Sequence, residues 1–259
     1  MYFIHGIKIL YFYLLCICTN QIILPDIFLS IDPEQKTACY DPEQKDSLNF
    51  SSITTAAEYY VHITLKEITS LPIRIFIDQG HNPEGINAGA EGFGLREQDI
   101  TYAVGIYLAN LLNEDPRFEA RTSRTTPEQS LGYSNASSLA ERVRLANTWP
   151  ADYFISIHCN ANDNPAINGT ECYVYQNYTQ AYYLAERILT SIVSRLDTKN
   201  NGVRINPSLY VLRRTNMPST LVELAYITNS EDAQKLGTRQ YDFAYAIYEG
   251  ILDYFGFTA

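Results

Sequence analysis

An apolar run ends in a polar turn and a histidine at Ile73-Arg74-Ile75-Phe76-Ile77-Asp78-Gln79-Gly80-His81. A second run of the same character, Tyr153-Phe154-Ile155-Ser156-Ile157-His158, also ends in a histidine. Short runs rich in β-branched and aromatic residues predict β-strands. Open α/β sheets place their chemistry at the carboxyl ends of their strands. Both histidines therefore stand where a functional site is expected.

From residue 71 onward, strand-like and helix-like segments alternate along the chain. The pattern predicts strands at 74–78, 119–123, 153–158, 170–175, 210–213 and 220–224. It predicts helices at 98–112, 138–148, 180–196, 230–236 and 241–254. Such alternation indicates an α/β fold with a mixed or mostly parallel twisted sheet that helices cover on both faces. We therefore expect a single domain over residues 71–259.

The N-terminal quarter has a different character. Lys8 precedes a ten-residue apolar run, Ile9-Leu10-Tyr11-Phe12-Tyr13-Leu14-Leu15-Cys16-Ile17-Cys18, which has the length of a signal-peptide core and is short for a membrane span. We expect residues 1–19 to be a signal peptide or a signal anchor in transient contact with the membrane, unless the start codon is misassigned. The protein is then exported to the cell wall or beyond, or held on the outer side of the membrane. Residues 20–70, with the repeated segment Asp-Pro-Glu-Gln-Lys, are expected to form a linker.

Composition excludes some classes of function. A formal net charge of −10 argues against a nucleic-acid binder. The five cysteines do not form a disulfide framework, because two of them lie in the signal-like segment. Cys159 and Cys172 could pair if their strands are neighbours, but buried free thiols are the expected state.

Two carboxylates occupy positions like those of the two histidines. Glu97 opens a predicted helix after the Gly-rich loop at 85–94, and Glu223 closes the apolar run Thr220-Leu221-Val222-Glu223. A glutamate at a helix start is also favoured by the helix dipole without any metal. A carboxylate in an apolar strand is unfavourable unless it is paired, solvated or functional. Two histidines and one carboxylate form a catalytic zinc set, and a further carboxylate can act as general base. The four residues together predict a zinc hydrolase.

Five blocks of the chain resemble the zinc-dependent N-acetylmuramoyl-L-alanine amidases of the type 3 family, over roughly residues 73–255. In chain order they are Ile77-Asp78-Gln79-Gly80-His81, Leu95-Arg96-Glu97-Gln98-Asp99-Ile100, Leu139-Ala140-Glu141-Arg142, Ser156-Ile157-His158-Cys159-Asn160-Ala161 and Met217-Pro218-Ser219-Thr220-Leu221-Val222-Glu223-Leu224. The resemblance implies that His81, Glu97 and His158 hold one Zn²⁺ ion and that Glu223 is the general base. It implies a catalytic domain that hydrolyses the amide between the lactyl group of N-acetylmuramic acid and L-alanine in peptidoglycan.

The chain departs from the family pattern around the first histidine and after the last strand. Gln79, Asn82 and Pro83 replace residues of the common Asp-Pro-Gly-His-Gly-Gly motif, and Ala225-Tyr226 replaces a common Gly-Phe. These changes affect the shape of the loop and the pocket wall rather than the set of ligands.

Three further residues are weaker candidates for substrate binding or for support of the metal ligands. Asp78 is expected either to orient His81, since a ligating histidine donates its other N–H to an acceptor, or only to form a turn. Asn160 is expected to shape the pocket or to cap its strand. Arg142 matches a family position, although an ion pair at the edge of the core would explain it as well.

Two other functions compete with the amidase. One is a zinc exopeptidase that acts on stem peptides. The other is an inactive metal-binding protein that binds or regulates the cell wall, although an inactive regulator would be expected to lose one of the four site residues. The sequence leaves the oligomeric state, the preferred stem peptide and any need for an activator open.

Overall fold

The structure is a computed structural model that describes residues 30–31, 38–39 and 71–258. The chain divides into two units, Met1–Ile68 and Thr69–Ala259. In the first unit, strands β1 (Ser30–Ile31) and β2 (Ala38–Cys39) pair antiparallel. The predicted signal segment and nearly all of the predicted linker lie outside the described residues. None of the helices in the described ranges is both long enough and apolar enough to cross a bilayer.

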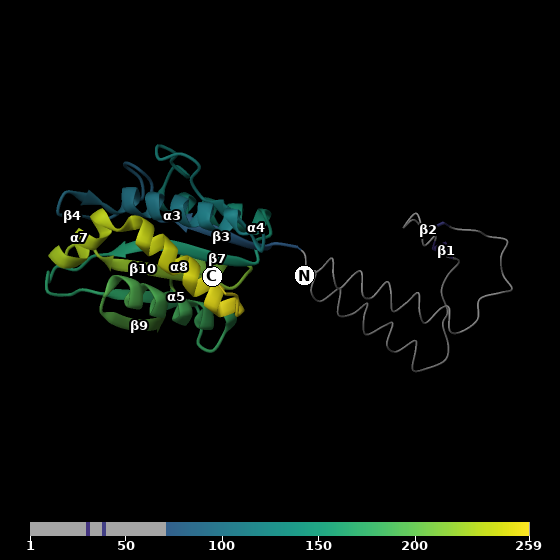
Figure 1. The fold of residues 1–259 in the computed structure, drawn as a ribbon. Helices are drawn as coiled ribbons and strands as arrows, with labels where there is room; N and C mark the ends of the chain where they lie inside the picture. Colours follow the sequence, from purple (N-terminus) through teal and green to yellow (C-terminus); the bar gives the residue numbers. More distant parts are fainter. Residues whose placement is uncertain (1–29, 32–37, 40–70, 259) are drawn as a thin grey trace. The chain divides into compact units, whose positions relative to one another are not determined.

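The second unit is built on a six-stranded sheet with the strand order β6-β3-β7-β10-β8-β9 (Figure 1). Its strands are β3 (Ile73–Gln79), β6 (Phe118–Thr122), β7 (Tyr153–Asn160), β8 (Thr170–Val174), β9 (Asn200–Ile205) and β10 (Ser219–Tyr226). Strands β6, β3, β7 and β10 are parallel to their neighbours, whereas β8 runs antiparallel to β10 and β9 runs parallel to β8. The expected mixed, mostly parallel sheet is confirmed.

Helices cover both faces of this sheet, as expected. They are α3 (Glu97–Glu114), α4 (Asn135–Thr148), α5 (Gln180–Leu196), α6 (Tyr210–Arg214), α7 (Ser230–Thr238) and α8 (Gln240–Phe255). One core contains side chains of α3, α5, α7 and α8 with one face of the strands. A smaller core joins Phe76, Phe154 and Leu221 on the opposite face to side chains of α4 and α6.

Helix α5 illustrates how the sequence produces this packing. Leu184, Ile188 and Ile192 recur every four residues and are fully buried, so they form one apolar stripe against the sheet. Gly250 of α8 lets the two helices approach closely, because a Cβ atom there would lie 2.6 Å from the Cα of Ile188. The pair therefore forms a tight layer on one side of the sheet.

The structure differs from the predicted elements at three places. The strand predicted at 210–213 is wrong, because these residues form the short helix α6. Strand β9 was not predicted, and it adds an edge to the sheet. The Gly-rich loop ends in a small hairpin of β4 (Glu91–Gly92) and β5 (Leu95–Arg96). Figure 1 shows β4 and α7 at the same end of the unit, at the left of the view.

Strand register brings the carboxyl ends of β3, β7 and β10 to one edge of the sheet. Gln79 of β3 pairs with Ile157 of β7, and His158 of β7 pairs with Glu223 of β10. On its other side, Glu223 pairs with Glu171 of β8. Directly paired residues point to the same face of a sheet, so His158, Glu223 and Glu171 form a polar row.

Candidate metal centre and active site

Three side chains converge at this edge of the sheet. Nε2 of His81, Oε1 of Glu97 and Nδ1 of His158 form a nearly equilateral triangle: the two nitrogens are 3.1 Å apart, and Oε1 lies 3.1 Å from His81 Nε2 and 3.0 Å from His158 Nδ1. The cluster draws one residue each from the loop after β3, the first turn of α3 and the end of β7. Within the described part of the chain, these three side chains form a group whose ligand atoms lie close enough together to hold a metal ion.

The donor set fits a zinc ion. Zinc takes imidazole nitrogen and carboxylate oxygen at about 2.0–2.1 Å, so the ligand atoms of a tetrahedral site lie about 3.3 Å apart. The triangle is slightly tighter than this value and needs only a small expansion. Three protein ligands leave the fourth position for water or substrate, which is the arrangement of catalytic rather than structural zinc sites.

The loop that carries His81 is fastened on several sides. His81 has a left-handed backbone with φ 68°, and its Nδ1 lies 3.2 Å from the carbonyl oxygen of Asn87. A backbone carbonyl is a usual partner for the second nitrogen of a metal-binding histidine. The side chain of Asn82 donates to the carbonyl of Leu131 and accepts from its N–H, at 2.9 and 3.0 Å. Asn82, one of the departures from the family motif, therefore ties this loop to the segment before α4.

Gly80 provides the space in which the ring of His158 lies. A Cβ atom at this position would lie 2.5 Å from Cε1 and 2.7 Å from Nδ1 of His158, closer than side-chain atoms approach. We expect Gly80→Ala to push the His158 ring out of the triangle and to lower metal affinity by about 10- to 100-fold. Competition with a chromophoric zinc chelator measures the change.

Gly237→Ala is the matched control for this substitution. Its Cβ atom would meet only the end of the Leu95 side chain at 3.3 Å, so we expect unchanged metal affinity. Equal affinities in the Gly80→Ala and wild-type proteins would contradict the packing argument.

Glu97 is held through both carboxylate oxygens. Its Oε2 accepts from the N–H of Ala90 and its Oε1 accepts from the N–H of Cys159, each at 2.9 Å. Burial disfavours the charged form of Glu97, but hydrogen bonds and charge from His158 and His81 outweigh burial and hold its pKa well below the usual range. Glu97 is therefore a fixed anion, as a metal ligand must be.

Glu223 lies next to the triangle without belonging to it. Its Oε2 is buried and accepts no hydrogen bond from the described residues. Burial raises the pKa of Glu223 well above the usual range, and the negative charges of Glu97 and Glu171 add to this effect. A carboxylate with an unused oxygen and an increased proton affinity is suited to proton transfer.

Comparison with known proteins accounts for this combination of fold and site. A family model described as N-acetylmuramoyl-L-alanine amidase matches residues 75–253. The chain belongs to this amidase family. The expected resemblance is thereby confirmed, and the match covers the three residues of the triangle and Glu223.

Relatives of the amidase family align with about 70% of the chain. LytC of Bacillus subtilis, an N-acetylmuramoyl-L-alanine amidase, is 37% identical over 185 residues, which are 70% of this chain and 35% of LytC. The uncharacterized protein YqiI of Bacillus subtilis is 38% identical over 185 residues, which are 70% of this chain and 84% of YqiI. The solved structure of the amidase AmiC2 of Nostoc punctiforme is 36% identical with a TM-score of 0.63, covering 72% of this chain and 99% of that chain. This chain thus spans about a third of LytC and most of YqiI.

Within the amidase fold, Asp78 and Arg142 form a buried ion pair next to the loop that carries His81. Arg142 Nη1 lies 2.6 Å from Asp78 Oδ1, and both side chains are 1% exposed. Arg142 also donates to the carbonyl oxygens of Gln79 and His81. Of the two roles expected for Asp78, a direct bond to His81 is not the one formed, since Asp78 accepts from Arg142 and Ser156, and His81 Nδ1 lies against the Asn87 carbonyl. Burial opposes ionisation of Asp78, but the Arg142 guanidinium keeps its pKa below the usual value. Arg142 thus links Asp78 to the backbone of His81.

Asn160 lies beside Glu171, a carboxylate that the sequence did not single out. Asn160 Nδ2 donates to Glu171 Oε1 at 2.6 Å, and the hydroxyl of Tyr173 donates to the same oxygen at 2.8 Å. Arg204 Nε lies 2.9 Å from Glu171 Oε2. The available signal was a charged residue inside the alternating strand 170–175. Asn160 contacts this buried cluster rather than any of the three ligand atoms.

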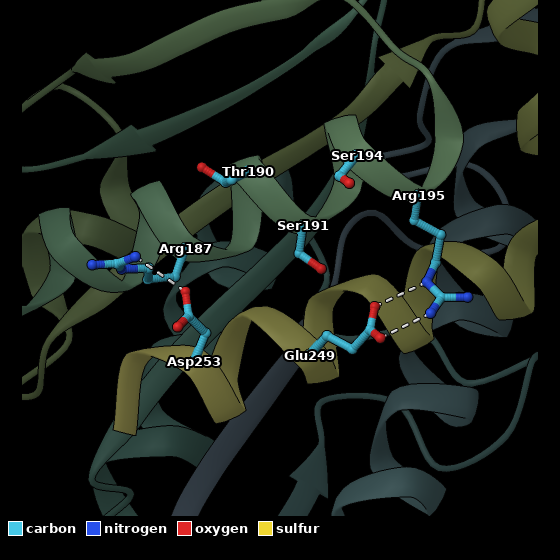
Figure 2. Close-up of a pocket in the computed structure, with 7 residues that line it drawn as sticks. All are labelled: Arg187, Thr190, Ser191, Ser194, Arg195, Glu249 and Asp253. Carbon is cyan, nitrogen blue, oxygen red and sulfur yellow. Dashed lines mark hydrogen bonds and ion pairs between the residues drawn. The ribbon is translucent and has the colours of Figure 1, made fainter. Parts of the chain in front are cut away.

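A pocket of the amidase domain lies away from these residues, between α5 and α8 on the helical layer (Figure 2). It is lined by Arg187, Thr190, Ser191, Ser194, Arg195, Glu249 and Asp253. Figure 2 shows that its cations already pair with its carboxylates: Arg187 lies 3.2 Å from Asp253, and Arg195 lies 2.8 Å from Glu249. These paired, solvated charges give no reason to place the chemistry there.

Cys159 and Cys172 are buried free thiols, as expected. They lie on β7 and β8, and β10 separates these strands in the sheet. Burial raises the pKa of each thiol, with a further contribution from nearby carboxylates. Neither thiol is therefore a candidate nucleophile or metal ligand.

Proposed function

We propose that this protein is a zinc-dependent peptidoglycan amidase. His81, Glu97 and His158 hold one Zn²⁺ ion, and Glu223 is the general base. The bond cleaved is the amide between the lactyl group of N-acetylmuramic acid and L-alanine. The observation that carries the proposal is the ligand triangle, with atoms 3.0–3.1 Å apart, directly beside a partner-free carboxylate oxygen in a member of the amidase family.

The reaction follows from the positions of these side chains. When bound, zinc would supply Lewis-acid chemistry, which lowers the pKa of water and polarises a carbonyl. Glu223 accepts the proton of the attacking water on its carboxylate. The same group then donates this proton to the leaving nitrogen of L-alanine, so one residue acts first as base and then as acid. His81 and His158 keep their orientation because Gly80 and the Asn87 carbonyl contact their rings.

The proposed setting is the cell wall. Peptidoglycan is the partner, and residues 71–259 are the catalytic domain. Residues 1–19 serve as the export signal or anchor, and residues 20–70 link them to the domain. A formal net charge of −10 disfavours nucleic acid as a partner.

Product analysis tests the proposed function. The full chain, loaded with zinc, is incubated with purified peptidoglycan, and the soluble products are identified by mass spectrometry. Free stem peptides with a new L-alanine amino terminus, beside intact glycan, are the expected result. Trimmed stems still attached to glycan would indicate the zinc exopeptidase instead. Zinc binding without any release would indicate the inactive wall-binding protein.

A further inference from the structure

The β4–β5 hairpin has an unusual residue at its tip. Strand pairs Glu91 with Arg96 and Gly92 with Leu95 leave a two-residue turn of Phe93 and Gly94. Both turn residues have positive φ, 53° for Phe93 and 76° for Gly94. Positive φ at both central positions defines the type I′ turn, which strongly prefers Asn-Gly.

Phe93 has an unfavourable backbone conformation, and its side chain is exposed. A bulky residue at positive φ is a conformational outlier. The side chain is 63% exposed, so packing in the core does not explain the aromatic ring. Residues held in such strained conformations cluster at functional sites and ligand clamps.

The hairpin is fixed to the metal ligand Glu97. The N–H of Glu97 donates to the carbonyl of Ala90 at 2.9 Å, and the N–H of Ala90 donates back to Glu97 Oε2 at 2.9 Å. On its other side, Gly92 packs so closely on the Ile227 carbonyl, just after β10, that a Cβ atom would clash. Phe93 is three positions after Ala90, so the tip of the hairpin lies within about 10 Å of Ala90 at about 3.4 Å per residue. The turn that carries Phe93 is therefore attached to Glu97 through Ala90 and to the end of β10 through Gly92.

We propose that Phe93 is a substrate-binding residue on which a sugar of the glycan strand stacks, next to the N-acetylmuramic acid that carries the scissile bond. The inference rests on the proposed amidase function and extends it to the glycan. An aromatic face is electron-rich and attracts the C–H groups on the face of a pyranose ring. The stem peptide is polar and carries carboxylates, for which Phe93 offers no partner. The glycan strand is thus the part of peptidoglycan that fits this surface.

The Phe93→Asn variant tests this role, and a loss of activity in it could not be attributed to loss of folding. Asparagine is favoured at this turn position, so the variant should be at least as stable as the wild type, with a melting temperature increased by about 2–4 °C. Kinetics are measured with long soluble peptidoglycan strands and with a muramoyl peptide that has one sugar. On long strands we expect kcat/KM to fall by about threefold to tenfold, through KM, and on the single-sugar substrate we expect no change.

Tyr178→Asn is the matched control. Tyr178 also has positive φ, 55°, and is 77% exposed. It follows the end of β8 that pairs with Thr220, which is the end of the sheet opposite Glu223. The control should gain stability in the same way and keep wild-type kinetics on both substrates.

Three results would overturn the inference. Unchanged kinetics of Phe93→Asn on long strands would remove the ring from glycan binding. An equal loss on both substrates would mean that the residue supports the centre rather than the glycan. A wild-type protein that releases no stem peptide would refute the amidase function itself and, with it, this role of Phe93.

Discussion

Replacing Glu223 with glutamine is expected to lower kcat by about 10²- to 10⁴-fold while the protein still binds one metal ion. Glutamine has the same shape but cannot accept the proton of the attacking water. Glu223 contributes no atom to the triangle of His81, Glu97 and His158, so metal content should not change. Turnover on peptidoglycan and metal content by mass spectrometry measure the two effects on the same sample.

Stability gives a third readout for the same variant. Burial raises the pKa of Glu223, which means that its charged form destabilises the folded state near neutral pH. Removing that charge should therefore increase the melting temperature of the metal-free protein while activity falls. Glu119→Gln, on the edge strand β6, is the control and should change neither. Near-normal turnover in Glu223→Gln would exclude it as the base, and loss of the metal would make it a ligand instead.

Replacing Arg142 with methionine is expected to destabilise the protein by about 3–5 kcal/mol. The substitution leaves Asp78 charged, buried and without its guanidinium partner, which is much less favourable than removing both charges. It also removes two donors to the backbone carbonyls of Gln79 and His81. Denaturant unfolding of the metal-free protein measures the loss.

Arg144→Met is a matched control on the same helix. Arg144 pairs with Glu141 at 2.7 Å, but its side chain is 57% exposed, and exposed ion pairs contribute about 0–1 kcal/mol. Adding Asp78→Asn to Arg142→Met should recover part of the loss. Without Arg142, burial would raise the Asp78 pKa, so the deficit should be greatest near neutral pH and shrink toward about pH 4. Equal losses in the two single variants would contradict the role of the buried pair.

The sequence was sufficient to predict that four residues far apart in the chain lie close together, as they do in the structure. His81, His158 and Glu223 follow apolar strands, and parallel strands bring their carboxyl ends to one edge. Glu97 begins the helix that follows the first of these strands. Strand ends and helix starts can be predicted from local patterns, so residues far apart in the chain could be placed at one site.

Two elements, α6 and β9, could not be predicted from these local patterns. In α6, the aromatic and β-branched residues Tyr210 and Val211 favour a strand, but Val211 and Leu212 are both buried while Arg213 and Arg214 are exposed. Burial of two consecutive residues fits a helical turn that packs on α4 better than a strand. This packing outweighs the strand propensity of the residues. Strand β9 contains Asn200, Asn201 and a glycine with φ 87°, and the register of β8 against β9 shifts beside it. Such a bulged edge strand lacks regular alternation.

The partners of buried charges were also unpredictable from the sequence. Asp78 was expected to orient His81 or to form a turn, and its ion pair with Arg142 depends on where α4 crosses the sheet. Glu171 appeared as one charge in a strand, and its contacts with Asn160, Tyr173 and Arg204 come from three different strands. Tertiary packing decides which side chains pair, and the spacing of residues along the chain does not reveal that packing.

The position of β10 between β7 and β8 determines how the domain responds to redox conditions. Cys159 and Cys172 are kept one strand apart and are sealed from solvent, so an oxidant has no accessible thiol to attack within residues 71–258. Reductants have no crosslink to break in the same region. Residues 71–258 should therefore fold equally well in a reducing cytosol and in an oxidising exterior. No thiol-exchange step should delay their folding.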